Sequence, residues 1–236
     1  MTLLEITNID AYYGNSHVLH GVSLTVDEGE LAVLIGRNGA GKTTTLKSIM
    51  GIVEPRSGQV EFDGENITSL ASNETAQRGI AIIPEERDLF PQLTVRENLR
   101  MGYIGHDVDG SEDDILAPIF EYFPQLADRK DQQAGSLSGG EQQMVAIGRA
   151  LVSDPDFLLV DEPTEGLMPT LVDKLGEILA RINDAGVTML LVEQNVDLAL
   201  EIGDYGYVID EGAIQTSAPA NELQADEEII EKYLAV

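Results

Sequence analysis

The sequence contains no cysteine among its 236 residues. This absence excludes disulfides, thiol chemistry and zinc sites with thiolate ligands. No apolar run approaches the ~18–20 residues that a membrane-spanning helix needs. The first ten residues carry acid and lack the apolar core of a signal peptide. We therefore expect a soluble protein that a partner chain would have to hold if it works at a membrane.

Basic residues are scarce as well. The chain has 14 Lys and Arg against 42 Asp and Glu, and its net charge is −28. Because the acid is dispersed between apolar runs, it predicts a solvated acidic surface like that of proteins from salt-loving organisms, in which salt screens the repulsion. The alternative is an ordinary acidic cytosolic protein, and in both cases the charge argues against nucleic-acid partners. The acidic stretch at 106–114 is interpreted as a solvated loop.

The apolar pattern alternates between short strands and helices, which predicts an α/β fold with a parallel sheet. The stretch between about 86 and 155 differs, because it has few strand signals and several helical ones. Strands are predicted at 3–9, 18–26, 31–35, 59–62, 80–83, 157–160, 187–192, 205–209 and 213–216, and helices at 43–50, 94–103, 111–123, 140–152, 171–184, 195–202 and 221–234.

A glycine-rich segment follows the buried strand at 31–35 and opens a helix. Its spacing, Gly-x4-Gly-Lys-Thr, lets backbone N–H groups point at phosphate oxygens, with the helix N-terminus behind them. Lys42 would contact the β- and γ-phosphates, and the Thr43 hydroxyl would bind Mg²⁺. The glycines do not make the Gly-x-Gly-x-x-Gly pattern of dinucleotide-binding folds. The residues expected to contact the nucleotide are Gly36, Arg37, Asn38, Gly39, Ala40, Gly41, Lys42, Thr43 and Thr44.

Two acids, Asp161 and Glu162, follow another buried strand and precede Pro163. In P-loop enzymes an acid at the end of such a strand holds Mg²⁺, which is the role expected of Asp161. Glu162 can polarise an attacking water as a general base. The pair is weak evidence alone and becomes strong beside the phosphate loop.

A second glycine motif, Leu-Ser-Gly-Gly-Glu-Gln-Gln, spans 137–143 and precedes a helix. Ser138 is expected at the N-cap, and the two glycines leave backbone N–H groups open to an anion. This string resembles the signature motif of ATP-binding cassette ATPases. The order of phosphate loop, signature and acidic pair matches that family across nearly the whole chain.

The resemblance implies a single domain, 1–236, with a P-loop NTPase (RecA-like) core at 1–85 and 156–236. It also implies an N-terminal antiparallel β subdomain and an inserted α-helical signature subdomain at 86–155. In this family two ATP molecules are sandwiched in a head-to-tail dimer. The residues implied to reach the ATP of the other subunit are Ser138, Gly139, Gly140 and Glu141.

Three further segments, 83–99, 163–169 and 191–195, resemble the ATPases of branched-chain amino-acid importers, as does the Tyr-Leu pair near the C-terminus. Importers of amides or urea are close in sequence. The resemblance implies ATP and Mg²⁺ as ligands and integral-membrane permeases as partners. It also implies a second cassette, identical or related, an extracellular substrate-binding protein that acts indirectly, and a place at the cytoplasmic face of the membrane.

Two positions depart from the general cassette pattern. Glu85 stands where most members have a Gln that contacts Mg²⁺ and the attacking water, and Gln194 stands where most have a His on the γ-phosphate. Both departures resemble the branched-chain group, so Glu85 remains a metal-ligand candidate and Gln194 a catalytic one. Tyr13 matches the aromatic residue that stacks on adenine, with Tyr12 as the competing assignment.

Two other classes of protein remain open. A soluble cassette protein of DNA repair, translation or cofactor assembly is disfavoured, because the chain has no long heptad insertion and a single cassette. A nucleotide sensor without turnover is disfavoured because Lys42, Asp161 and Glu162 are all present.

Overall fold

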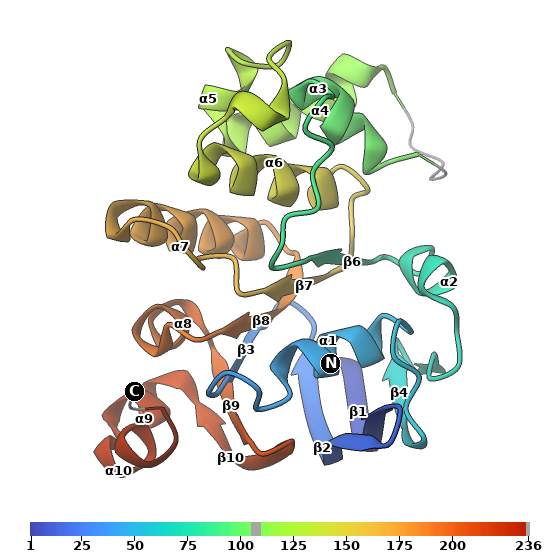
Figure 1. The fold of residues 1–236 in the computed structure, drawn as a ribbon, viewed down its shortest axis with the longest axis vertical. Helices are drawn as coiled ribbons and strands as arrows, with labels where there is room; N and C mark the ends of the chain where they lie inside the picture. The colour runs from blue at the N-terminus through green and yellow to red at the C-terminus, as the bar shows by residue number, and fades with distance from the viewer. Residues whose placement is uncertain (105–109, 235–236) are drawn as a thin grey trace.

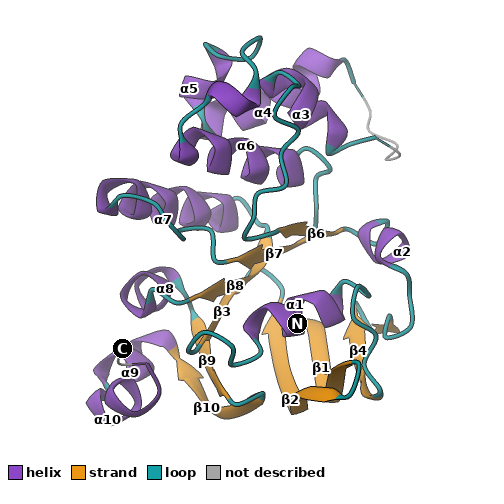
Figure 2. Cartoon of the chain, viewed as in Figure 1, coloured by secondary structure: helices purple, strands orange, loops and turns teal. Residues whose placement is uncertain are grey.

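The computed structural model describes residues 1–104 and 110–234. Residues 106–109 of the predicted acidic loop therefore lie outside the described part. Two β-sheets pack near one end of the molecule, and a group of helices caps the other end (Figures 1 and 2).

The smaller sheet is antiparallel, as expected for the N-terminal region. Its strand order is β2-β1-β4-β5, and β1 pairs with both β2 and β4. Alternate residues along these strands are buried, so one face of the sheet covers a core and the other faces solvent. Its strands are β1 (Thr2–Tyr13), β2 (Ser16–Asp27), β4 (Ser57–Phe62) and β5 (Glu65–Asn66).

The main sheet has the order β10-β9-β3-β8-β7-β6. Strands β9, β3, β8, β7 and β6 run parallel, and β10 joins β9 antiparallel as the predicted hairpin. Every residue of the three central strands is buried, which explains their continuous apolar sequences. Its strands are β3 (Leu31–Ile35), β6 (Ile80–Ile83), β7 (Phe157–Asp161), β8 (Thr188–Glu193), β9 (Tyr205–Asp210) and β10 (Ala213–Pro219).

The main sheet separates two hydrophobic cores. Leu158 and Val160 of β7 face the core formed with the helices, whereas Phe157 and Leu159 face the core formed with the antiparallel sheet and α1 (Lys42–Ile49). Phe157 packs edge-on against Phe62 of β4, with ring centroids 5.9 Å apart. Both faces of the main sheet are therefore covered. In such folds ligands bind outside the carboxyl ends of the parallel strands, which we call the carboxyl edge of the sheet.

Between β6 and β7, the described residues contain helices and loops but no strand. Thr94, Ser111 and Ser138 each cap a helix with a side chain that accepts a hydrogen bond from the amide three residues on. The helices here are α3 (Val95–Met101), α4 (Glu112–Tyr122), α5 (Pro124–Ala127), the 3-10 turn η1 (Ala134–Ser136) and α6 (Gly139–Leu151). They form the upper group in Figure 1. The subdomain boundaries at 85/86 and 155/156 stay a prediction.

The remaining helices cover the main sheet, and one prediction about them is wrong. The single helix expected at 221–234 is interrupted at Asp226, whose carboxylate accepts hydrogen bonds from the amides of Glu228 and Ile229. Asp favours such local bonds over a helix interior, which explains the break. The elements are α2 (Ser72–Ala76), α7 (Pro169–Asp184), α8 (Val196–Ile202), α9 (Ala220–Ala225), α10 (Glu227–Ile229) and a π-helical turn, η2 (Ile230–Leu234).

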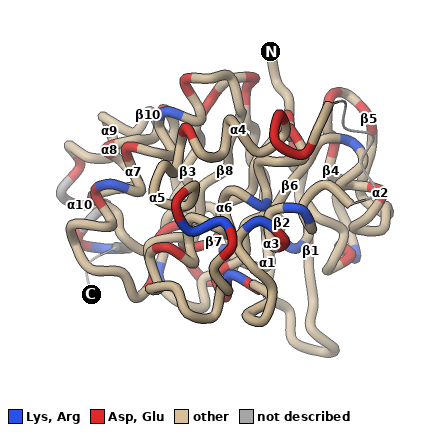
Figure 3. The backbone as a smooth tube through the Cα atoms, turned by 90° about the horizontal axis from the view of Figure 1, so that it is seen from above, with Lys and Arg blue, Asp and Glu red and all other residues tan. Residues whose placement is uncertain are grey.

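Acidic residues are distributed over the molecule and not gathered in a tail (Figure 3). Within the described ranges, no helix is long and apolar enough to cross a membrane.

Candidate nucleotide-binding site

The phosphate loop leaves the carboxyl end of β3 and leads into α1. Gly36 is required here because a Cβ at this position would collide with the Ile209 carbonyl oxygen. Gly41, directly before the helix, has φ 111°, a left-handed conformation that glycine adopts without strain. Ala40 and Gly41 are buried, whereas the tip of the loop at 37–39 is exposed. The backbone is therefore turned as the sequence predicted, with its tip open to solvent.

Lys42 is held at the base of this loop and is only 3% exposed. Its Nζ donates to the Gly36 carbonyl oxygen at 2.9 Å and to that of Arg37 at 3.2 Å. It also lies 3.0 Å from Oε1 of Glu162. The predicted phosphate-binding lysine and the predicted general base are thus in direct contact.

A cavity of about 310 Å³ opens over the loop. It collects eight of the predicted site residues from three separate segments of the chain. Its lining residues are Val18, Asn38, Gly39, Gly41, Lys42, Thr43, Thr44, Glu85, Glu162 and Glu165. Predicted residues of the phosphate loop, the acidic pair and the adenine and γ-phosphate contacts that do not line it are Tyr13, Gly36, Arg37, Ala40, Asp161 and Gln194.

Oxygen groups of the kind that Mg²⁺ prefers meet where Thr43, which lines the cavity, contacts Asp161. The Thr43 hydroxyl donates to Oδ1 of Asp161 at 3.1 Å, so the two groups are adjacent although 118 residues separate them. Within the described ranges, no group of three or more Asp, Glu, His or Cys forms a closed metal cage. Mg²⁺ commonly takes one or two carboxylates and completes its shell with water and substrate phosphates. A hydroxyl beside a carboxylate therefore fits this ion better than it fits Ca²⁺ or Zn²⁺.

Asp161 and Glu162 share the end of β7 but differ in their surroundings. Burial raises the pKa of Asp161 to about 6, and the nearby carboxylates of Glu162 and Glu85 add to this rise. Glu162 is 8% exposed and has φ 42°, a conformation uncommon for residues other than glycine. Such backbone positions cluster at functional sites. The turn directs Glu162 to Lys42 while Asp161 points to Thr43.

Two further acids were not singled out for this site by the sequence. Glu165 lines the cavity, and a hydrogen bond with Glu162 raises the pKa of Glu165. Glu193, at the end of β8, is 2% exposed, and burial raises the pKa of its carboxyl. In a chain with 42 acidic residues no local pattern distinguishes these two. The available signal was their position: Glu165 follows β7, and Glu193 ends the adjacent strand β8.

Glu85 lies in the loop after β6 and reaches the cavity from its side. The next residues of this loop are tied to α6, because the Arg149 guanidinium donates to the carbonyl oxygens of Arg87 and Asp88. Arg87 and Asp88 both have positive φ, at 61° and 45°. The Arg87 guanidinium also donates to Gln143 on α6 at 2.8 Å. The loop of Glu85 is thus fastened to the helix that begins with the signature motif.

The signature motif begins α6, as predicted, with Ser138 at the N-cap. The Ser138 hydroxyl accepts from the Glu141 amide, and the Glu141 carboxylate accepts from the Ser138 amide and hydroxyl. Arg129 holds Glu141 from the side at 2.8 Å. Gly139 and Gly140 form the first turn, where helix geometry leaves backbone N–H groups without an intrahelical partner. No residue of 138–141 lines the cavity over the phosphate loop.

Tyr12 and Tyr13 differ in exposure. Tyr12 lies beneath the Arg56 guanidinium at 4.0 Å and stacks on the His17 ring at 4.1 Å. Tyr13 is 48% exposed at the end of β1. Both faces of Tyr12 therefore have partners, which favours Tyr13 for stacking on adenine.

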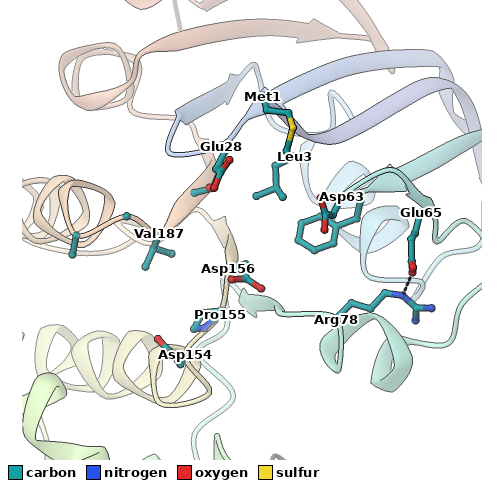
Figure 4. A pocket seen from close by; sticks show the side chains of 14 residues that line it. Met1, Leu3, Glu28, Asp63, Glu65, Arg78, Asp154, Pro155, Asp156 and Val187 are labelled. Atoms are coloured by element: carbon teal, nitrogen blue, oxygen red, sulfur yellow. Dashed lines mark hydrogen bonds and ion pairs between the residues drawn. The ribbon is translucent and has the colours of Figure 1, made fainter.

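A second cavity, of about 550 Å³, lies at the amino ends of β7 and β8 (Figure 4). Asp156 and Thr188 line it, and the ion pair of Arg78 with Glu65 closes one side. None of the predicted site residues lines it. The larger cavity is therefore not the candidate site, whose predicted residues lie at the opposite ends of these strands.

Comparisons with known proteins agree with this geometry. The family model described as ABC transporter matches residues 19–165. BraG of Pseudomonas aeruginosa, a high-affinity branched-chain amino acid transport ATP-binding protein, is 41% identical over 98% of this chain and 99% of its own length. LivF of Archaeoglobus fulgidus, a probable protein of the same kind, is 38% identical over 94% of each. LptB of Escherichia coli, from a lipopolysaccharide export system, is 34% identical over 99% and 98%.

Solved structures give the same result. An ATP-binding cassette of an ABC transporter in its ADP conformation has a TM-score of 0.85 and 29% identity, covering 98% of each chain. A bacterial ABC transporter cassette solved as a dimer has a TM-score of 0.83 and 25% identity, covering 92% of this chain and 99% of its own. The α/β P-loop fold expected from the sequence is confirmed, and the chain belongs to the ABC transporter family.

Proposed function

We propose that this chain is the ATP-hydrolysing subunit of an ABC importer for branched-chain amino acids. The observation that carries this proposal is the contact between Lys42 and Glu162 at the carboxyl edge of the main sheet, with Thr43 and Asp161 beside it. The identity to BraG and LivF, higher than that to LptB, supports import of amino acids. Importers of amides or urea remain the alternative cargo class.

Each residue at this edge would have its own role in hydrolysis. Lys42 would exchange its present carboxylate and carbonyl partners for the β- and γ-phosphates. Thr43 and Asp161 would hold Mg²⁺, with Glu85 reaching it from the side; when bound, the ion neutralises phosphate charge. Glu162, released from Lys42, would orient and deprotonate the attacking water. Gln194 would donate a hydrogen bond to the γ-phosphate, and Tyr13 would stack on adenine.

A second cassette would complete each site. Because the signature motif of this chain does not line its own phosphate cavity, we infer that it faces the ATP of a partner in a head-to-tail dimer. Ser138 and the amides of Gly139 and Gly140 would contact that γ-phosphate, beside Glu141. The partner is a second copy of this chain or a related cassette, and no nucleic acid is expected to bind a surface of net charge −28.

Membrane attachment would come from permease chains. A groove of about 370 Å³ lies beside the loop of Glu85, and the exposed Phe90 and Met101 line it together with Arg149. We propose that this groove receives a permease segment at the cytoplasmic face of the membrane. The Arg149 contacts would then transmit its movement to the loop of Glu85. A substrate-binding protein would act from outside through the permeases.

Two measurements test the proposal together. The tagged chain is purified with its native membrane partners, which are identified by mass spectrometry, and phosphate release is assayed in liposomes. We expect permeases to co-purify and a leucine-loaded binding protein to stimulate phosphate release. Partners of a lipopolysaccharide export system, or stimulation by urea and not by leucine, would refute the branched-chain assignment. Recovery of ribosomes or DNA would refute the transporter assignment.

A further inference from the structure

The carboxylate of Glu193 is a buried charge that the proposed hydrolysis does not use. Glu193 ends β8, where its backbone pairs with Ile35 directly before the phosphate loop. On the other side, β7 continues to Glu162, whose amide donates to the Val192 carbonyl oxygen. The side chain is 2% exposed. Glu193 therefore sits between the strand that carries the phosphate loop and the strand that carries the acidic pair.

The two oxygens of this carboxylate bind two different loops. Oε1 accepts from the Thr164 amide at 3.1 Å and from the Thr164 hydroxyl at 2.7 Å. Oε2 accepts from the amides of Gln194 and Asn195 at 3.1 and 3.2 Å. Thr164 lies two residues after Glu162. One carboxylate thus connects the loop of the proposed general base to the loop of the proposed γ-phosphate contact.

This arrangement is costly for the fold. All four donor groups are uncharged, and burying a carboxylate without a countercharge is unfavourable. Burial raises the pKa of Glu193 even though the hydrogen bonds act in the opposite direction. An apolar residue would continue the buried sequence of β8 at lower cost. The position therefore favours a role that needs two acceptor oxygens at a fixed spacing.

We propose that Glu193 is a positioning residue for hydrolysis, which holds the Gln194 loop and the Glu162 loop at a fixed separation. This inference rests on the proposed ATPase function. Glu193 does not reach the phosphate cavity, and it acts through the two loops. Movement of either loop would change where Glu162 and Gln194 stand relative to the γ-phosphate, without changing the loop that binds the nucleotide.

Glu193→Gln is the variant that tests this role. The amide keeps one acceptor oxygen and places an NH₂ group at the other position, so one loop loses the backbone N–H hydrogen bonds that it makes to this side chain at constant side-chain size. We expect kcat for phosphate release to fall about 10-fold or more, because displacement of catalytic groups by about 1 Å costs up to 10²-fold. The KM for ATP should stay within about threefold of the wild-type value, because the substitution is not expected to weaken ATP binding in the ground state. Glu201→Gln, the same change on the exposed side of α8, is the control and should match the wild type.

A double-mutant cycle with Gln194→Ala separates positioning from general damage. If Glu193 acts through the Gln194 loop, the double variant should be close to the slower single variant in kcat. Effects that multiply both with Gln194→Ala and with Glu162→Gln, or a parallel rise in KM and fall in thermal midpoint, would overturn the proposal. If Glu193→Gln folds poorly, Thr164→Val, which removes the 2.7 Å hydroxyl contact and keeps the amide contact, replaces it. A wild-type chain without phosphate release in the complex purified with its partners would refute the proposed ATPase, whereas an active wild type with an unaffected Glu193→Gln refutes this inference alone.

Discussion

Polar groups at the carboxyl edge of the main sheet are buried, whereas those of the signature motif face solvent. Lys42 and Asp161 are each 3% exposed and have hydrogen-bond or ion-pair partners within the chain. Ser138 and Gly139 are exposed, and Ser138 is tied only to its own helix turn. We call the first region the phosphate edge (42, 161–162 and 193) and the second the signature turn (138–141).

The difference between the regions indicates how much of the site one chain supplies. At the phosphate edge, the charged groups have buried partners within the chain, which Lys42 would exchange for phosphate oxygens when ATP binds. At the signature turn, a capping box fixes the helix end, with Ser138 and Gly139 exposed and Gly140 buried. If the signature turn faces a second cassette as proposed, changes in the two regions should affect different steps.

The largest effect is expected from Glu162→Gln. Removal of the general base should lower phosphate release by about 10²-fold or more. ATP-driven dimerisation should remain, because Gln keeps the size of the side chain and removes its negative charge. Phosphate release and light scattering in high salt measure the two properties. Retained turnover would contradict the role of Glu162. Loss of dimerisation would contradict the claim that changes in the two regions affect different steps.

A smaller loss is expected from a charge at the signature turn. Ser138→Asp keeps a good N-cap residue and adds a negative charge that would face the γ-phosphate. ATPase activity should fall by about 10-fold, the effect of about 1.4 kcal/mol of repulsion. Nucleotide affinity of the monomer should be unchanged.

Ser138→Asn is the matched neutral variant, since it also caps the helix, and should be much more active. Fluorescent ATP binding and phosphate release separate affinity from turnover. Equal activity of the Asp and Asn variants would show that no phosphate approaches this turn.

Asp161→Asn should stabilise the protein when Mg²⁺ is absent. The pKa of Asp161 is raised from 3.8 to about 6, so this buried group lowers stability as the pH rises from 3.8 to about 6, and the loss is complete above 6. The variant's thermal midpoint at pH 8 should exceed that of the wild type by about 2–4 °C, which corresponds to about 1 kcal/mol. The difference should shrink as the pH falls below 6. A difference that does not change with pH would contradict burial as the cause.

The smallest effect is expected from Glu141→Gln. This variant should destabilise the protein, whereas Asp161→Asn should stabilise it. Hydrogen bonds from Ser138 lower the pKa of Glu141, so the ionised carboxylate stabilises the fold above its ordinary pKa. That contribution is lost as the pH falls through the lowered value. At pH 7 the variant should lose about 0.5 kcal/mol of unfolding free energy in urea, as for a weakened cap. Glu177→Gln, on the exposed side of α7, is the control, and an equal loss there would remove the assignment to the cap.

Much of this arrangement could be predicted from the sequence, for a physical reason. The continuous apolar run at 31–35 is β3 to the residue, because a strand buried on both faces favours apolar side chains at successive positions. The phosphate loop and Ser138 were found because their local conformations demand particular residues. Tertiary contacts carry no such local signal, so the Glu193 bridge and the approach of Glu165 to Glu162 were missed. The halophilic origin stays a prediction, since charge alone suggested it.

Mixing two impaired variants tests most directly whether the phosphate edge and the signature turn are halves of one site. Lys42→Ala disables the first, and Ser138→Asp lowers the activity that depends on the second by about 10-fold. In a head-to-tail dimer of the two, one site combines both defects and the other combines an intact phosphate edge with an intact signature turn. Phosphate release should therefore rise above that of either variant when the two are mixed, approaching one working site per mixed dimer. A mixture that is no more active than its separate components, while the wild type alone is active, would contradict the account.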